Sequence, residues 1–210
     1  MTIKDQRRLD DHYSRKARKE GYPARSVWKL EEFDRKYGLF KPGQKVLDLG
    51  CAPGGWTLYA AAKVGAGGLA LGYDLALPKG QKFPAQVVLR EADLAEIDSA
   101  EAVDLGPFDV VLSDMAPKTT GRREIDQALS LRLCLIAWDW ARKSAKKGGF
   151  FLLKIFQSPD GDRFLKSLEP YFRKRTLLKP QATRKESQEI YFLGQAFAGP
   201  EAAAAYEFVF

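Results

Sequence analysis

The segment that most constrains the fold is residues 46–56, with the sequence VLDLGCAPGGW. It joins a short aliphatic run to a turn rich in glycine and proline, and an alanine-rich segment with helical character follows. Glycines in such a turn allow a positive φ and remove the Cβ atoms that would keep a ligand away from the backbone. The following helix presents unpaired backbone N–H groups at its N-terminus. The succession of strand, tight turn and helix therefore predicts a binding site for a small molecule.

The spacing within this segment excludes two common nucleotide-binding motifs. It does not match G-x-G-x-x-G after Gly50, and it lacks the Lys–Ser/Thr pair of a phosphate-binding P-loop. An ordinary turn between a strand and a helix, with glycines for geometry alone, is the alternative interpretation.

Later apolar runs are followed by acidic residues. Residues 69–74 predict a second strand that ends in Asp74, residues 87–89 a third, and residues 108–114 a fourth that ends in Asp114. In α/β nucleotide-binding folds, an acid at the end of the second strand accepts hydrogen bonds from ribose hydroxyls. Asp74 is a candidate for that role, and Asp93, after the third strand, would place a carboxylate near an adenine amino group.

Alternating strands and helices predict an α/β fold with a mostly parallel sheet. The helical segments are residues 25–37, stopping at Gly38, residues 124–146, stopping at glycines 148 and 149, and residues 160–172. Further strands are expected at residues 150–156, 175–178 and 190–193. The connection of residues 179–189 contains no helical crossover, so the last strand is expected to be antiparallel.

Two charged residues stand out in this arrangement. Lys154 lies within an otherwise apolar strand, where a charge is costly unless it is paired or lies at the strand end. Glu189 precedes the antiparallel strand, which begins at the edge of the sheet where the parallel strands end. We therefore expect Glu189 to lie near Asp74 and Asp114, at the edge where open α/β sheets bind ligands.

The net charge of +7 and the pI near 9.3 favour a polyanionic partner. Basic residues crowd the N-terminal segment, the region after the fourth strand and a stretch near the C-terminus. If these clusters converge on one face of the fold, they could follow a phosphate backbone. The alternative is that each cluster is a separate solvated face. The members are Arg7, Arg8, Arg15, Lys16, Arg18, Lys19, Arg25, Arg122, Arg123, Arg173, Lys174, Arg175, Lys179, Arg184 and Lys185.

Composition argues against several other classes. One histidine, His12, and two cysteines, Cys51 and Cys134, without C-x-x-C spacing suggest no disulfide framework, metal site or Ser-His-Asp triad. No apolar run is long enough to span a bilayer, and the N-terminus does not resemble a secretion signal. We expect a cytoplasmic protein without membrane contact, monomeric by default. It would have a basic arm at residues 1–24, one domain at residues 25–197 and a tail of unknown role at residues 198–210.

Four segments together resemble the FtsJ family of ribose 2′-O-methyltransferases: DLGCAPGGW at 48–56, SDMAP at 113–117, LKIFQ at 153–157 and SQEIY at 187–191. The resemblance covers most of the chain. It implies a Rossmann-like, S-adenosylmethionine-dependent fold with seven strands, the last antiparallel, and helices on both faces. Bacterial members of the family methylate large-subunit ribosomal RNA, so it also implies 2′-O-methylation of a ribose in that RNA.

The same resemblance carries the family's functional residues onto this chain. The implied catalytic set is Lys29, Asp114, Lys154 and Glu189. The implied contacts to S-adenosylmethionine come from Gly54, Trp56, Asp74, Asp93 and Asp114. The chain departs from the family pattern at Cys51, where a bacterial member has alanine, at Pro23-Ala24, which interrupts a basic approach to Arg25, and in the tail from residue 198.

Methyl transfer to a ribose 2′-hydroxyl needs the hydroxyl oriented in line with the sulfonium methyl and relieved of its proton. A lysine acts as a base only if its pKa is lowered, by desolvation or by a nearby cation. We expect Lys154, near Lys29, to be that base or to steer the hydroxyl. Asp114 would orient Lys154 and the methyl donor, and Glu189 would position Lys29 or the ribose. Three alternatives remain open: methylation of transfer RNA, a non-catalytic RNA-binding assembly factor, and a small-molecule methyltransferase.

Overall fold

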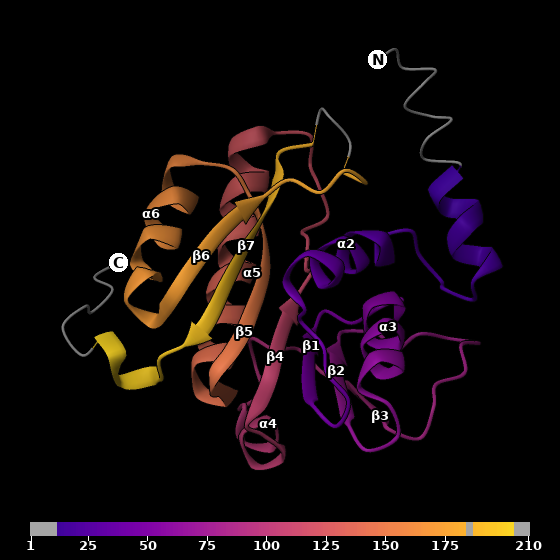
Figure 1. The fold of residues 1–210 in the computed structure, drawn as a ribbon. Coiled ribbons are helices and arrows are strands. Elements are labelled where there is room, and N and C mark those ends of the chain that lie inside the picture. The colour runs from indigo at the N-terminus through magenta and orange to yellow at the C-terminus, as the bar shows by residue number, and fades with distance from the viewer. Residues whose placement is uncertain (1–11, 184–186, 204–210) are drawn as a thin grey trace.

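A single seven-stranded sheet crosses the molecule (Figure 1). The computed structural model describes residues 12–183 and 187–203 of the 210-residue chain. The strand order is β3-β2-β1-β4-β5-β7-β6. β7 is antiparallel to both of its neighbours, and the other pairs are parallel, which confirms the predicted sheet. The strands are β1 (Lys45–Leu49), β2 (Leu69–Asp74), β3 (Val87–Glu91), β4 (Phe108–Ser113), β5 (Ala145–Phe156), β6 (Phe172–Leu178) and β7 (Glu189–Phe197).

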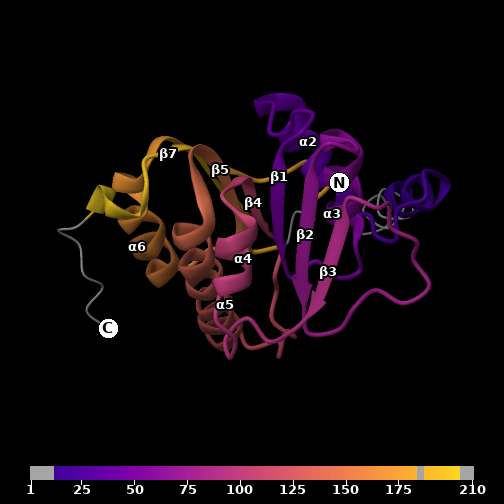
Figure 2. The ribbon, with the colours of Figure 1, turned by 90° about the horizontal axis from the view of Figure 1, so that it is seen from below.

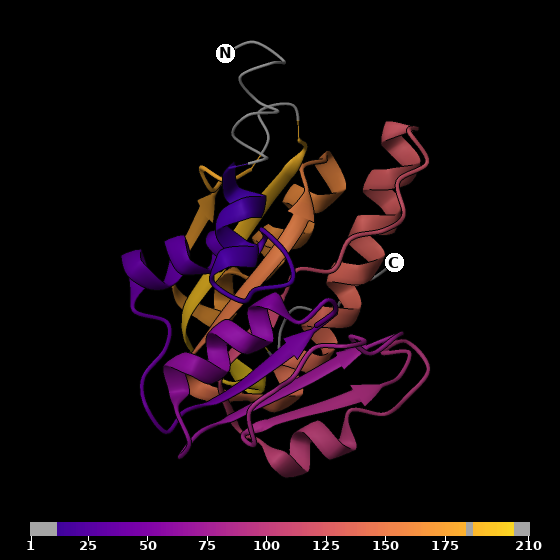
Figure 3. The ribbon, with the colours of Figure 1, turned by 90° about the vertical axis from the view of Figure 1, so that its right-hand side faces the viewer.

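Helices cover both faces of the sheet (Figures 2 and 3). On one face α2 (Val27–Tyr37) and α3 (Gly55–Val64) enclose one apolar core. On the other face α4 (Ala100–Leu105), α5 (Arg123–Ser144) and α6 (Pro159–Ser167) enclose a second. The short 3-10 helix η1 (Glu169–Tyr171) precedes β6, and a second one, η2 (Pro200–Ala203), follows β7.

The central strands are largely apolar because both of their faces are buried, and Asp48 in β1 and Lys154 in β5 are the buried charged exceptions. In β1, Leu47 and Leu49 pack into the core beneath α5, and Val46 packs into the core beneath α2 and α3. The predicted stop of α2 is confirmed, because Gly38 adopts the left-handed conformation (φ 63°) and its N–H donates to the Asp34 carbonyl. Because β1, β2, β4 and β5 run parallel to one another, their carboxyl ends lie at the same end of the sheet.

Several boundaries differ by a few residues from those expected, and three of these differences are instructive. The helix α5 ends at Ser144, and Gly149 lies within β5, where a Cβ would stand 2.8 Å from the Asp109 carbonyl oxygen of β4. This glycine allows close strand approach rather than stopping a helix. The helix α6 ends at Ser167, before Pro170, which lacks an N–H and follows in η1. Glu189 does not precede the last strand but is its first residue, paired with Phe156.

Part of the predicted N-terminal arm packs against α2. Residues 12–19 are helical, and Ala17 is buried. The Trp28 indole N–H donates to the Tyr13 carbonyl over 2.9 Å, and the Lys16 ammonium lies 3.7 Å from the Trp28 ring centre. The predicted basic residues Arg7, Arg8, Arg184 and Lys185 lie outside the described residues. No helix in the described part of the chain is long and apolar enough to cross a membrane.

Candidate active site

A cavity of about 350 Å³ lies at the carboxyl ends of β1, β2 and β4. We call it the motif cavity because the turn after β1 forms one wall. Gly50 in that turn has φ 78°, and a Cβ there would stand 2.3 Å from the Met115 side chain, so only glycine fits. The lining residues are Gly50, Ala52, Asp74, Leu75, Ala92, Asp93, Leu94, Asp114, Met115, Ala116, Leu133 and Ile136.

Three of the predicted cofactor contacts, Asp74, Asp93 and Asp114, line the motif cavity together. One oxygen of Asp74 accepts the N–H of Ala52 over 2.8 Å, which ties the glycine turn to the end of β2. Asp93 accepts the N–H of Ala95 over 2.9 Å and so shapes the loop after β3. Both carboxylates therefore order the walls of the cavity as well as facing it.

The other two predicted cofactor contacts, Gly54 and Trp56, do not line the motif cavity. Trp56 is 3% exposed and donates its indole N–H to the Ser26 carbonyl over 2.9 Å. It borders a small recess that shares Gly50, Ala52 and Asp114 with the motif cavity. Gly54 precedes α3 with φ 100°, and a Cβ there would stand 2.6 Å from the Phe83 ring. Direct contact of Gly54 and Trp56 with a cofactor stays a prediction.

Sequence reasoning missed Asp48, the buried acid of β1 that borders the same small recess. The Thr57 hydroxyl donates to Asp48 Oδ2 over 2.5 Å, whereas Oδ1 has no hydrogen-bond partner among the described residues. Burial raises the pKa of Asp48 to about 7; the Thr57 hydrogen bond opposes the rise, and the charges of Asp114 and Asp74 add to it. An acid within a buried aliphatic strand was the available signal. The unpartnered oxygen fits the cationic part of a ligand.

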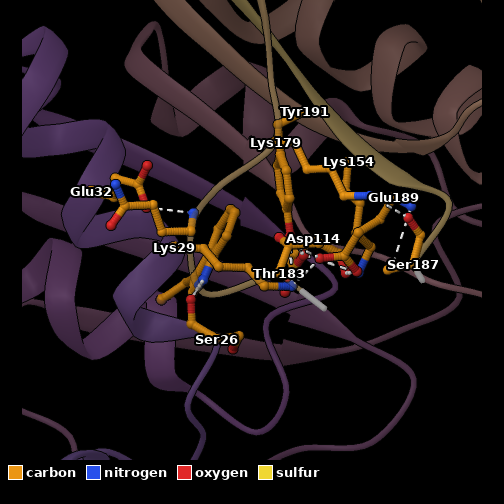
Figure 4. A network of polar contacts seen from close by, with 12 residues as sticks. Ser26, Lys29, Glu32, Asp114, Lys154, Lys179, Thr183, Ser187, Glu189 and Tyr191 are labelled. Carbon is orange, nitrogen blue, oxygen red and sulfur yellow. Dashed lines mark hydrogen bonds and ion pairs between the residues drawn. The ribbon is translucent and has the colours of Figure 1, made fainter. Parts of the chain in front are cut away.

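The four predicted catalytic residues do come together, although they derive from distant parts of the chain (Figure 4). Lys154, in β5, lies 2.9 Å from Asp114 Oδ1 and donates to the Asp114 carbonyl. Lys29, in α2, pairs with Glu189 at the start of β7. The Lys154 and Lys29 side chains are 7% and 12% exposed, so both ion pairs are largely withdrawn from water.

Tyr191 connects the two pairs, and sequence reasoning missed it as well. Its hydroxyl donates to Asp114 Oδ1 over 2.7 Å and accepts from Lys29 Nζ over 3.3 Å. Burial, followed by the negative charges of Asp114 and Glu189, raises the pKa of Tyr191 well above its usual value. The available signal was its position two residues after Glu189, on the same face of β7.

The Lys29–Glu189 pair also borders a second opening of about 240 Å³, lined by Arg25, Lys29, Ser187 and Glu189. We call it the basic recess. The Thr183 hydroxyl lies 3.1 Å from Glu189 Oε1 and helps to hold this carboxylate. Arg25, from the predicted N-terminal basic cluster, therefore lies at the catalytic end of the sheet.

The predicted cluster after β4 also reaches this end. Arg123, at the start of α5, donates to the Gln188 side chain over 3.1 Å, next to Glu189 in the sequence. Arg173, Lys174 and Arg175 instead lie along β6 at the far edge of the sheet. Within residues 12–183 and 187–203, no group of three or more His, Cys, Asp or Glu side chains could hold a metal ion.

A family model described as FtsJ-like methyltransferase matches residues 22–197. The chain belongs to the FtsJ-like methyltransferase family. It is thus a methyltransferase, and the resemblance carried by the four sequence segments is confirmed. Methyltransferases of this type use S-adenosylmethionine in general.

Named relatives and solved structures agree with the family. The chain is 46% identical over 189 residues to "Ribosomal RNA large subunit methyltransferase E" of Desulfosudis oleivorans, covering 90% of this chain and 91% of that protein. It is 44% identical over 195 residues to the protein of that name in Coxiella burnetii, covering 90% and 92%. A solved chain from Plasmodium falciparum matches with a TM-score of 0.68 and 22% identity, covering 85% of this chain and 100% of that one, and supports the fold.

Proposed function

We propose that this methyltransferase transfers a methyl group from S-adenosylmethionine to the 2′-hydroxyl of a ribose in large-subunit ribosomal RNA. The observation that carries the proposal is the pair of buried Lys–carboxylate contacts joined through Tyr191, with a ligand-sized cavity on one side and a basic opening on the other. The names of the relatives from Desulfosudis and Coxiella support the choice of RNA.

The motif cavity would hold the cofactor. Asp74 would accept hydrogen bonds from the cofactor ribose, and Asp93 would face the adenine. Asp48 Oδ1, which has no partner, and Asp114 would face the cationic methionine end, near Trp56 and the turn that contains Gly54. When bound, S-adenosylmethionine supplies a methyl group activated by a sulfonium centre.

The basic recess would receive the target ribose, because Lys29 and Arg25 offer positive charge where the flanking phosphates lie. The neutral amine of Lys154 would orient the 2′-hydroxyl and take its proton as the methyl group leaves the donor, which converts the amine to an ammonium. Asp114, in contact with Lys154 and Tyr191, would hold that ammonium in place, and Glu189 would do the same for Lys29. The protein groups thus order the nucleophile and the donor in line.

The substrate places the protein in the cytoplasm, acting on large-subunit RNA either free or within the subunit. One chain carries all four catalytic residues, which supports a monomer as the working unit.

The experiment that tests the proposal incubates the purified protein with methyl-labelled S-adenosylmethionine and either large-subunit ribosomal RNA, ribosomal subunits or transfer RNA. Mapping of the labelled nucleotide then identifies the methylated atom. We expect a 2′-O-methyl group in large-subunit RNA, abolished in Lys154→Ala and kept in Lys147→Ala, a matched lysine at the exposed end of the same strand. The proposal would be overturned if the label appeared in transfer RNA and not in ribosomal RNA, or if the methyl group were found on a base.

A further inference from the structure

A further opening lies between α6 and the edge strand β6, two elements that are labelled in Figure 1. Its volume is about 700 Å³, against about 350 Å³ for the motif cavity. We call it the α6–β6 groove. It is lined by Gln157, Asp162, Leu165, Lys166, Glu169, Arg173, Lys174, Arg175, Thr176, Leu177 and Phe192.

The rim of the α6–β6 groove carries uncompensated positive charge. Arg175 pairs with Glu169, whereas Lys166, Arg173 and Lys174 form no ion pair with any described acid. Exposed cations at the opposite end of the sheet are different. Arg142 and Lys143 share Asp139, and Lys146 and Lys147 pair with Asp109 and Glu201. The groove therefore presents cations that are ready to meet an anionic ligand.

The floor of the groove is apolar. Leu177 is 56% exposed, which is unusual for a leucine in a strand, and it stands opposite Phe192 in the β6–β7 pairing. Leu165 of α6 completes this floor. Unpaired cations around an apolar floor suit a polymer with an anionic backbone and less polar sugar and base groups, and not a free inorganic anion.

The groove is continuous with the catalytic end of the sheet. Gln157, which lines it, follows β5 only three residues after Lys154, and its N–H donates to the Gln188 carbonyl over 2.9 Å. Gln188 directly precedes Glu189, which lines the basic recess. A strand of RNA with its target ribose in the basic recess can therefore continue along this edge into the groove.

We propose that the α6–β6 groove is a second RNA-binding site, which holds the backbone of the substrate at a distance from the methylated ribose. Arg173, Lys174 and Lys166 contact phosphates, and Leu177 packs against a sugar or base. The inference rests on the proposed function, since it takes RNA as the substrate. The groove contributes affinity and takes no part in the methyl transfer.

The test compares the double variant Arg173→Gln/Lys174→Gln with the control Arg142→Gln/Lys143→Gln, which removes two exposed cations already paired with Asp139. RNA affinity is measured by fluorescence anisotropy at several salt concentrations, with S-adenosylmethionine absent. We expect the groove variant to bind RNA about three- to tenfold more weakly and the slope of log K against log salt to fall by about 1.4 to 1.8. The control should bind like the wild type.

Methylation assays separate this inference from the proposed function. At saturating RNA the groove variant should keep the wild-type kcat while its KM rises, because the catalytic residues are untouched. Equal RNA affinity and equal salt slope in the groove variant and the wild type would overturn the inference and leave the proposed function intact. Such a result, together with aggregation of the variant, would mean that the cations only protect the open edge of β6. If the wild type bound RNA more tightly than the groove variant but methylated no RNA, the proposed function would be overturned instead.

Discussion

The two Lys–carboxylate pairs carry the same charges and similar burial, yet they lie in opposite electrostatic surroundings. In the Lys154–Asp114 pair, Asp114 lines the motif cavity, close to Asp48 and Asp74. Lys29–Glu189 faces the basic recess, beside Arg25. Acidic surroundings favour a cationic ligand, and basic surroundings favour phosphates. On this difference we base the proposal that one pair serves the methyl donor and the other the RNA, with Tyr191 between them.

The largest expected effect separates the two pairs directly. Lys154→Ala should lower the rate of methyl transfer by about 10³-fold or more, because it removes the group that we propose to orient the hydroxyl and take its proton. Titration calorimetry should still detect binding of S-adenosylmethionine, since the motif cavity does not include this side chain. Substantial remaining activity would show that the pair nearest the donor is structural.

Asp48→Asn tests the acidic surroundings of the first pair. A carboxyl group with a pKa near 7 in the folded state and 3.8 as its ordinary value binds more protons folded than unfolded between these values. The free energy of unfolding of the wild type therefore falls as pH rises through this window, and Asn removes the fall. Between pH 5 and pH 8 the free energy of unfolding, measured by urea unfolding, should fall by up to about 3 kcal/mol more in the wild type than in the variant.

Asp98→Asn, at an exposed aspartate, is the control for this measurement. Its unfolding free energy should follow the wild type across the same pH range. The Asp48→Asn variant should also bind S-adenosylmethionine more weakly, because the unpartnered carboxylate oxygen is lost. Unfolding curves for Asp48→Asn that run parallel to those of the wild type would mean that the acid does not change its protonation on folding.

Lys29→Ala should have a smaller effect on catalysis than Lys154→Ala, about 10²-fold in kcat/KM, with KM for RNA raised. The reason is that Lys29 lines the basic recess, where we propose that it acts on the substrate rather than on the donor. Lys36→Ala, at an exposed lysine of the same helix, is the matched control. If Lys29→Ala lowered cofactor affinity and left KM for RNA unchanged, the assignment of the two pairs would be reversed.

Tyr191→Phe should have the smallest effect, about tenfold in kcat, because only the two hydrogen bonds of its hydroxyl, to Asp114 and from Lys29, are lost while the ring still packs. Steady-state kinetics of this variant are compared with Tyr171→Phe, at a tyrosine in η1. Coupling is measured by repeating Lys29→Ala in the Tyr191→Phe background. If the losses simply multiply, the two pairs act independently and Tyr191 does not join them.

Much of the fold was predictable because it depends on patterns within single segments. Continuous apolar runs marked the buried strands, and the short connection before Glu189 indicated the antiparallel last strand. The strand bounds of residues 69–74 were predicted without error. The end of α5 was misplaced because Gly149 serves the close approach of β4 and β5, a contact that no local pattern reveals.

The candidate site was only partly predictable for the same physical reason. The sequence by itself determined the family, the four residues of the two ion pairs and the acids that end the strands. Only the tertiary structure decided that Lys29 meets Glu189 across 160 positions of the chain, that Tyr191 joins the two pairs, and that one oxygen of Asp48 lacks a partner. Motifs depend on residue type and local spacing, whereas pairing and burial depend on how distant segments pack, so these contacts arise only when the sheet is assembled.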